Sequence, residues 1–236
     1  MSDPKKVAIV TGGSQGIGAA VVDAFRGDGY AVVAAARSMD QPLDPDLLAV
    51  SGDITEPATA RRIVEAAHRR FGRVDCLVNN AGIYIGKPFT DYTLDDYAAI
   101  TAVNLAGFFH MTQQVIPLMV DQGCGHIVNV STSLVDQPDH TRPAALAALT
   151  KGGLVAVTRS LAIEYAAHRV RFNAVSLGVV ETGGHDPHSY DGLAELHPLG
   201  RLGNVGDVAE GIRYLERAAF VTGEILHIDG GQSAGH

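Results

Sequence analysis

The sequence predicts an α/β fold in which a single domain is built on a doubly wound parallel sheet. Short apolar runs rich in β-branched residues alternate with longer segments of helical spacing. The runs are apolar on both faces, as strands of a parallel sheet covered by helices on both sides require. The length of 236 residues suits one domain, and no linker or internal repeat divides residues 1–236.

The expected strands and helices follow one another along the chain. Strands are predicted at 6–11, 30–36, 47–53, 74–80, 126–131 and 170–176, and helices at 18–29, 56–72, 93–120 and 143–168. Pro57 fits the first turn of the second helix, and two of the helices end near a glycine that suits a C-cap. The irregular segment 178–200, rich in Gly, Pro, His and Asp, is expected to form a short substrate loop or lid.

Composition and charge exclude several classes of partner. The net charge of −8 without a run of Lys or Arg argues against nucleic acid or an anionic membrane. No apolar stretch reaches about 18 uncharged residues, and the N-terminus lacks the apolar region of a signal peptide, so we expect a cytoplasmic protein. Cys76 and Cys124 are too few for a disulfide framework; Cys76 is expected to be buried and Cys124 to lie in a turn.

A glycine-rich motif, "TGGSQGIG" at 11–18, follows the first expected strand and opens the first expected helix. In that context Gly12 can adopt backbone angles closed to other residues, Gly16 lets the chain approach a pyrophosphate, and Gly18 permits close packing of the helix. The helix N-terminus adds free N–H groups and a partial positive charge. The motif therefore predicts a dinucleotide site, which also includes Ser14 and Ile17.

The end of the second expected strand indicates which dinucleotide is bound. An acidic residue there would hold a ribose 2′-hydroxyl, whereas an arginine accommodates a 2′-phosphate. The strand ends at Ala36 and is followed by Arg37, so no carboxylate repels a phosphate and a guanidinium is available to pair with it. NADP(H) is favoured over NAD(H).

Several further motifs lie along the chain. They are "GDIT" with Asp53, "NNAG" at 79–82, "VNLAG" with Asn104, "HIVNVSTS" at 126–133, "TKGGL" with Lys151, "RFNAVS" at 171–176, "RLGNVGDVAE" at 201–210 and "TGEILHIDGG" at 222–231. With the glycine-rich motif, they make the chain resemble the short-chain dehydrogenase/reductase family, classical type, over nearly its whole length. The resemblance implies a Rossmann-type sheet of about seven strands and a homodimer or homotetramer.

The resemblance also implies roles for individual residues. It places Asp53 and Ile54 at the adenine, Thr182 near the nicotinamide amide, and the segment Asn79, Asn80, Ala81 and Gly82 along the cofactor. In the family a hydride passes between the nicotinamide and a carbonyl carbon while a tyrosine gives a proton to the oxygen. Lys151 would lower the pKa of that tyrosine and hold the ribose, Asn104 would support a water relay, and Thr132 or Ser133 would orient the substrate.

The sequence departs from the family at the tyrosine. Tyrosine and lysine stand four residues apart on one helix face, but the residue four before Lys151 is Ala147, and 144–149 contain only Ala and Leu. Another group could donate the proton: Tyr84 is the best positional candidate, His140, His185, His188 and Tyr190 lie on loops, and a water could be relayed through Lys151 and Asn104. The substrate could instead be an iminium, which needs no acid, or the protein could bind the cofactor without catalysis.

The sequence is therefore interpreted as an atypical oxidoreductase that transfers a hydride between NADP(H) and a C=O or C=N group of a small organic substrate. The alternative is a non-catalytic NAD(P)-binding scaffold or sensor. The "HDPH" segment at 185–188 lacks a third ligand at a recognisable spacing, so no metal site is predicted.

Overall fold

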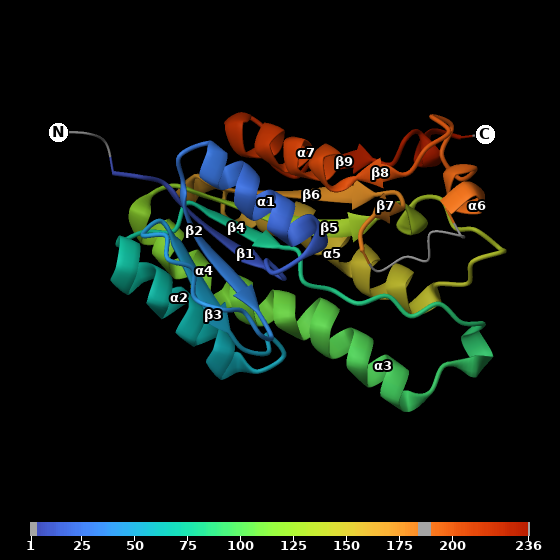
Figure 1. Ribbon diagram of the computed structural model, residues 1–236, viewed down its shortest axis with the longest axis horizontal. Coiled ribbons are helices and arrows are strands. Elements are labelled where there is room, and N and C mark those ends of the chain that lie inside the picture. The colour runs from blue at the N-terminus through green and yellow to red at the C-terminus, as the bar shows by residue number, and fades with distance from the viewer. Residues whose placement is uncertain (1–3, 184–189, 236) are drawn as a thin grey trace.

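Seven parallel strands form the central sheet of the computed structural model, which describes residues 4–183 and 190–235 (Figure 1). Their order is β3-β2-β1-β4-β5-β6-β9. The strands are β1 (Val7–Thr11), β2 (Ala31–Ala36), β3 (Leu47–Ser51), β4 (Cys76–Asn79), β5 (Gly125–Thr132), β6 (Val170–Leu177) and β9 (Ile225–Ile228). All six predicted strands are confirmed within a few residues at each end, and the seventh, β9, lies inside the motif 222–231.

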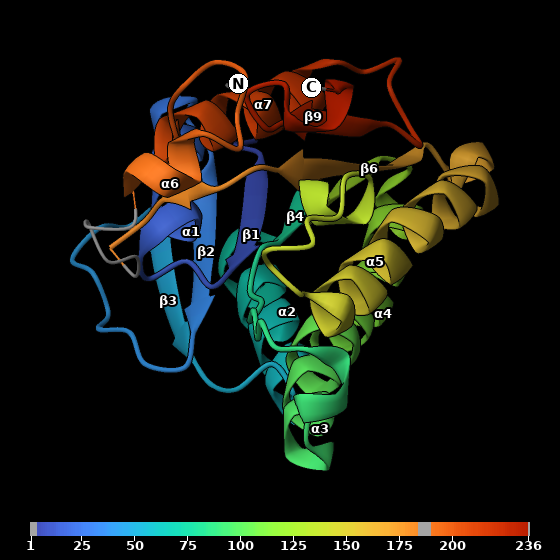
Figure 2. The same ribbon diagram turned by 90° about the vertical axis from the view of Figure 1, so that its right-hand side faces the viewer.

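Helices cover both faces of this sheet (Figure 2). Helices α1 (Gly16–Gly27) and α7 (Val205–Arg217) pack on one face, where Phe25 and Ile212 are buried. On the other face lie α2 (Pro57–Phe71), α4 (Phe108–Gln122) and α5 (Ala145–Glu164), which bury Ile63 and Met111 against the strands. Strands β1 and β2 are buried from both sides, which is why Thr11 is the one polar residue in them.

The predicted helix at 93–120 is wrong as a single element. The structure divides it into α3 (Leu94–Thr101), a π-helical segment (Ala102–Gly107) and α4. A Cβ on Gly107 would lie 2.5 Å from Cδ1 of Ile54, so the widened turn brings the backbone close to the loop after β3. Such segments often mark functional sites, and this one carries Asn104.

The predicted helix ends agree better with the structure. Pro57 occupies the first turn of α2, and Gly72 ends that helix with a φ of 78°, in the left-handed region that glycine adopts without strain. Helix α3 begins at a capping box in which the Thr93 side chain accepts from the Asp96 N–H and the Asp96 carboxylate accepts from the Thr93 N–H. The helix predicted at 143–168 ends earlier, at Glu164.

The described part of the predicted loop at 178–200 contains two short elements, strand β7 (Val180–Glu181) and the helical turn α6 (Tyr190–Ala194). Strand β7 pairs with β8 (Gly203–Asn204), which follows the loop. His185 and His188 lie outside the described residues. This segment follows the carboxyl end of β6, and the glycine-rich motif follows the carboxyl end of β1. In doubly wound sheets ligands bind at that edge, where the strand order reverses between β1 and β4.

One helix of the described chain, α5, is long and apolar enough by length and composition to cross a membrane, with a mean hydropathy of 1.3. It carries Lys151 and Arg159 and packs against β5 and β6. The apolar residues Leu154, Val155 and Ala162 are buried in that contact. These are features of a helix that covers a sheet.

Candidate active site

The glycine-rich motif forms the floor of a cavity of about 420 Å³ at the carboxyl edge of the sheet. Gly12 adopts a φ of +69°, and a Cβ on Gly18 would lie only 2.1 Å from the carbonyl oxygen of Gly12. The loop and the first turn of α1 can therefore approach each other only because both residues are glycine. Helix α1 starts at Gly16, and its N-cap residue Gln15 makes no side-chain cap bond. The Gln15 side chain therefore leaves the first backbone N–H groups of the helix available to a ligand in the cavity.

Every predicted cofactor residue except Asn79 and Lys151 lines this cavity. They are Gly12, Ser14, Gly16, Ile17, Gly18, Arg37, Asp53, Ile54, Asn80, Ala81, Gly82 and Thr182. Sequence reasoning missed Gln15, Gly52, Ile83 and Val103, which also line it. Val103 reaches the cavity from the π-helical segment, and no residue-type signal marks it.

Thr11 joins the two loops that bound the cavity. Its Oγ1 accepts from the backbone N–H groups of Asn80 and Ala81, both at 3.0 Å, and the Asn80 side chain donates to the Thr11 carbonyl at 2.8 Å. Asn79 does not lie along the cofactor cavity: its amide points into the interior and donates to Thr112 and Asn129. That part of the expectation is wrong, because alternate residues at the end of a strand face opposite sides of the sheet.

The far end of the cavity holds the residues expected to distinguish the two dinucleotides. Ala36 ends β2 and Arg37 follows it, exposed at the cavity wall and without a hydrogen bond or ion pair to any described residue. Asp53 accepts from the Thr55 N–H at 2.9 Å, which fixes the turn that carries Ile54. The glycine-rich loop at 11–18 and the N-terminus of α1, together called the glycine cradle below, suit a pyrophosphate. The Arg37 guanidinium suits an adenosine ribose that carries a phosphate.

Lys151 lies beside Gly82, which lines both the cofactor cavity and a second cavity. A Cβ on Gly82 would lie 2.9 Å from the Lys151 Nζ and 3.2 Å from the Asn104 Oδ1. The ammonium donates to the Val130 carbonyl at 2.7 Å. Burial lowers the pKa of Lys151 to about 8, because the charged form loses hydration.

Asn104 ties the π-helical segment to its neighbours. Its Oδ1 accepts from the Ile83 N–H at 2.9 Å, and its Nδ2 donates to the Ile83 carbonyl and to the Thr150 hydroxyl. These bonds hold the loop after β4 against α5, next to Lys151. Asn104 is buried, so the arrangement is rigid.

Ala147 lies one turn before Lys151 on α5 and is only 2% exposed. Its methyl group belongs to a small apolar cluster with Ile100 and Leu146, and Ile85 and Tyr92 pack against that cluster. Tyr92 donates its phenol to the Ile85 carbonyl at 2.8 Å, so that phenol is already bound within the loop after β4. Ala147 lines neither cavity.

The second cavity, of about 630 Å³, adjoins the first through Ile17, Gly82 and Thr182. Thr132 and Ser133, the two candidates for orienting a substrate, both line it. The Ser133 hydroxyl donates to the Gln232 side chain at 2.8 Å, whereas the Thr132 Oγ1 accepts from the Leu134 N–H and donates to none of the described residues. Thr132 therefore keeps its hydroxyl proton available to a ligand.

Tyr84 also lines the second cavity, but its position differs from that of an acid held against Lys151. The residue is 58% exposed, and a Cβ on Gly86 would lie 2.7 Å from its phenol oxygen, so the ring lies over its own loop. Burial raises the pKa of the Tyr84 phenol. Of the other candidates, His140 lines neither cavity and its side chain is 97% exposed. The Tyr190 side chain, like His185 and His188, lies outside the part of the chain that the structure describes.

His197 positions the segment after β6, and sequence reasoning missed it. The buried ring accepts from the Val179 N–H at 3.0 Å through Nε2, with Nδ1 3.1 Å from the Leu193 carbonyl. Val179 and Leu193 both line the second cavity, so His197 fixes part of its wall. A lone histidine in a Gly- and Pro-rich segment gives no sequence signal of this role.

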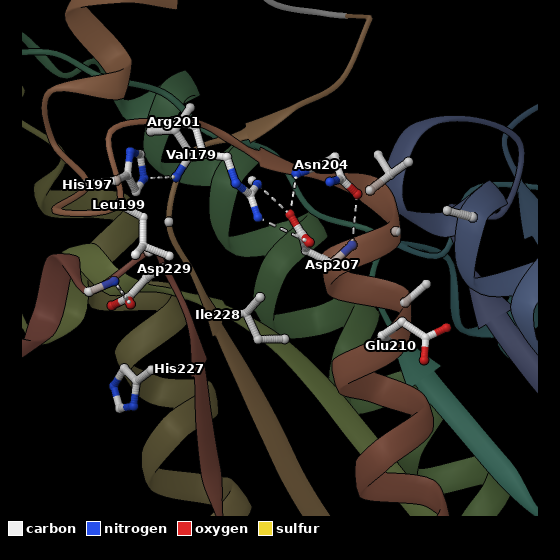
Figure 3. Close-up of a pocket in the computed structure, with 18 of the residues that line it drawn as sticks. Val179, His197, Leu199, Arg201, Asn204, Asp207, Glu210, His227, Ile228 and Asp229 are labelled. Atoms are coloured by element: carbon white, nitrogen blue, oxygen red, sulfur yellow. Dashed lines mark hydrogen bonds and ion pairs between the residues drawn. The ribbon is translucent and has the colours of Figure 1, made fainter.

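A larger cavity of about 810 Å³ lies between α1, α7 and β9 and contains none of the predicted site residues (Figure 3). Arg201 in its wall donates to Asp207 at 2.8 Å, and Asp207 accepts from the backbone N–H of Asn204 in the cap of α7. The Arg201 guanidinium is therefore already compensated by a carboxylate.

A buried polar cluster lies at the opposite, amino-terminal edge of the sheet. Ligand atoms of Cys76, His126 and Glu216 lie within 4.8 Å of one another. The Glu216 carboxylate accepts from His126 Nδ1 at 2.7 Å and from the Tyr30 hydroxyl at 2.8 Å, and it faces Lys6 and Arg171. These bonds and cations already satisfy the carboxylate. Cys76 is buried and Cys124 is exposed between α4 and β5, as expected.

Comparisons with known proteins agree with this geometry. The family model described as enoyl-(acyl carrier protein) reductase matches residues 12–233. The 3-oxoacyl-[acyl-carrier-protein] reductase FabG of Thermotoga maritima is 33% identical over 96% of this chain and 97% of its own.

Two solved structures are similar in fold and carry a nicotinamide dinucleotide. ElxO with NADP bound has a TM-score of 0.92 and 28% identity, over 98% of this chain and 100% of that one. The 3-ketoacyl-(acyl-carrier-protein) reductase of Brucella melitensis complexed with NADH has a TM-score of 0.88 and 33% identity, over 97% and 98% of the two chains. With the glycine cradle and the sheet order, these matches show that the chain belongs to the short-chain dehydrogenase/reductase family, classical type.

Proposed function

We propose that the protein is an oxidoreductase of the cytoplasm that transfers a hydride between NADP(H) and a C=O or C=N group of a small organic substrate, without a tyrosine acid. One observation carries the proposal: the cofactor cavity and the second cavity share Ile17, Gly82 and Thr182, and Lys151 lies beside Gly82. A nicotinamide at that junction would face a substrate in the second cavity. When bound, the cofactor supplies or accepts the hydride.

Arg37 supports NADP(H) over NAD(H). Its guanidinium lies at the cavity wall without a partner in the described chain, and no carboxylate ends β2. A 2′-phosphate would form charge-assisted hydrogen bonds there, whereas a 2′-hydroxyl would leave the guanidinium unpaired. Asp53 is held by its own turn through Thr55.

Thr132 would orient the reacting group of the substrate. It lies at the carboxyl end of β5 and lines the second cavity, and its hydroxyl donates to no residue of the described ranges 4–183 and 190–235. Ser133 would support the same wall through its bond to Gln232. A hydroxyl donor at the developing negative charge of a carbonyl oxygen stabilises the transition state more than the ground state.

The Lys151 ammonium is the best candidate for the proton donor, directly or through a water held near Asn104. An alanine methyl at position 147 cannot donate a proton. Tyr84 has a raised pKa and lies over its own loop. Lys151 has a pKa of about 8, which suits proton donation near neutral pH, and its Nζ lies beside the glycine that both cavities share.

Two alternatives remain because Ala147 removes the family's phenol. An iminium substrate would need no acid at the reacting carbon, and a scaffold or sensor would bind the dinucleotide without turnover.

We also propose a homodimer or homotetramer, since Phe109 on α4 and Leu149 and Ile163 on α5 are large exposed apolar residues. Light scattering in solution tests the assembly, and a monomer would contradict it.

The function is tested by NADPH oxidation with ketones, aldehydes and cyclic imines, for the wild type and for Lys151→Ala. The proposal predicts turnover by the wild type and a loss of about 10²-fold or more in Lys151→Ala with ketones. Turnover of imines alone, insensitive to the acid, would support the iminium alternative. Cofactor binding by calorimetry with no turnover of any class would contradict the proposal and favour the scaffold or sensor.

A further inference from the structure

The second cavity contains one charged side chain among its described residues, Arg142. Most of the remaining wall is apolar and comes from Leu134, Leu177, Val179, Val180, Leu193 and Leu196. The Asp139 carboxylate, 3.6 Å from its Nε, compensates part of the Arg142 charge. In a largely apolar wall, the remaining N–H groups of the guanidinium attract an anionic group of a ligand more strongly than they would in water.

Arg142 is held in place, but its guanidinium keeps N–H donors that bind no described residue. Its Nη2 donates to the Gly192 carbonyl at 3.3 Å, and its Nε lies 3.6 Å from the Asp139 Oδ2, an ion pair too long for a hydrogen bond. Asp139 is itself fixed, because its Oδ1 accepts from the Thr141 N–H and hydroxyl, both at 2.8 Å. The Arg142 Nη1 has no partner in the described chain, and the side chain is 34% exposed.

Tyr84 also lines this cavity, and the charges of Arg142 and Asp139 both act on its phenol. Burial raises the pKa of Tyr84, with a smaller opposing effect of Arg142, so the phenol keeps its proton at neutral pH and can donate a hydrogen bond. A neutral phenol and a guanidinium in the wall of one cavity offer two kinds of donor to an anionic ligand.

We infer that the substrate carries a carboxylate that binds to Arg142 and Tyr84, while its carbonyl or imine group lies at Thr132. This inference rests on the proposed function and names its substrate class: an oxo acid or imino acid with an apolar body. A carboxylate matches the planar guanidinium with two oxygens in one plane. The apolar wall between the ends would contact the carbon chain.

The test uses straight-chain oxo acids whose ketone lies two to six carbons from the carboxylate, each beside its methyl ester. The NADPH-dependent kcat/KM is measured for the wild type, Arg142→Gln and Arg142→Lys. A matched control is Arg159→Gln, an exposed arginine on α5 outside the cavities. The wild type is expected to prefer the acid over the ester at least tenfold at one chain length, mainly through KM.

Arg142→Gln is expected to lower that preference at least tenfold, Arg142→Lys to restore part of it, and Arg159→Gln to leave the ratio as in the wild type. If Arg142 has a purely structural role, Arg142→Gln would lower kcat/KM for the acid and for the ester by the same factor. That result would overturn the inference. Equal use of acid and ester by the wild type, or stronger use of phosphorylated ketones of the same length, would also overturn it.

A binding readout separates this inference from the proposed function. The same acid and ester pairs are titrated into the NADP-loaded protein by calorimetry. If no substrate turns over but the acids still bind more tightly than the esters in an Arg142-dependent way, the proposed activity fails and the anion site stands. If ketones turn over but neither assay shows a preference for acids, the anion site fails and the activity stands.

Discussion

The contact between Gly18 and Gly12 gives a sharp prediction about cofactor binding. A Cβ at position 18 would lie 2.1 Å from the Gly12 carbonyl oxygen and 2.7 Å from the Asn80 Nδ2. Carbon and oxygen atoms cannot approach that closely, so Gly18→Ala must move the glycine loop away from α1 by about 1 Å. That shift displaces the N–H groups that would hold the pyrophosphate.

Overpacking of this kind costs about 1–3 kcal/mol. If half of that cost appears in the bound state, the Kd for NADPH rises about two- to twelvefold, since about 1.4 kcal/mol corresponds to a factor of ten. The matched control is Gly27→Ala at the other end of α1, where an added Cβ meets nothing within 4 Å. An alanine there should leave the Kd unchanged and stabilise the helix by up to about 1 kcal/mol.

Fluorescence titration of NADPH measures the Kd of both variants, and urea unfolding measures their stability. A Gly18→Ala protein that binds NADPH as tightly as the wild type, at unchanged stability, would refute the placement of the loop against α1. An equal loss of binding in Gly27→Ala would show that the effect is not local to the cradle.

Three further variants test other parts of the account. Arg37→Ala should weaken NADPH binding by about tenfold or more while changing NADH little, measured by calorimetry; equal losses for both would contradict the 2′-phosphate role. Glu216→Ala should lower the free energy of urea unfolding by about 3–5 kcal/mol, because it leaves the His126 N–H and the Tyr30 hydroxyl buried without an acceptor; a loss below about 1 kcal/mol would contradict that. Ala147→Tyr should raise ketone reduction at least tenfold if Ile85 and Tyr92 can make room for the new phenol; no gain in a folded variant that binds NADPH would mean that the loop after β4 excludes it.

Local patterns in the sequence predicted most of the fold. The strands were predictable because both faces are buried, which makes each one a continuous apolar run bounded by polar residues. The glycine cradle was predictable because its backbone geometry excludes other residues at Gly12 and Gly18. The division of 93–120 was not, since the π-helical segment depends on contacts of Gly107 with Ile54 and of Asn104 with Ile83, far apart along the chain.

In the candidate site, too, residues marked by a local pattern were predictable and residues placed by the chain path were not. The position of Lys151 and Ala147 followed from the four-residue spacing on one helix face. The assignment of Asn79 failed because a strand end places neighbouring residues on opposite faces, and only Asn80 faces the cavity. The chain path after β5, β6 and β9 brings Arg142, His197 and Gln232, respectively, to the second cavity or to its wall, and no local pattern specifies that path.

The pH dependence of NADPH-dependent ketone reduction tests the proposed role of Lys151 most directly. Burial lowers the pKa of Lys151 to about 8, so the ammonium that donates the proton is present below that pH and is lost above it. The account predicts that kcat/KM for reduction is level below pH 8 and falls about tenfold per unit above it, while oxidation of the alcohol rises up to about pH 8. A reduction rate that stays level to pH 10 would indicate a phenol or a reaction without an acid, and a fall centred near pH 6.5 would indicate a histidine; either result would contradict Lys151 as the donor.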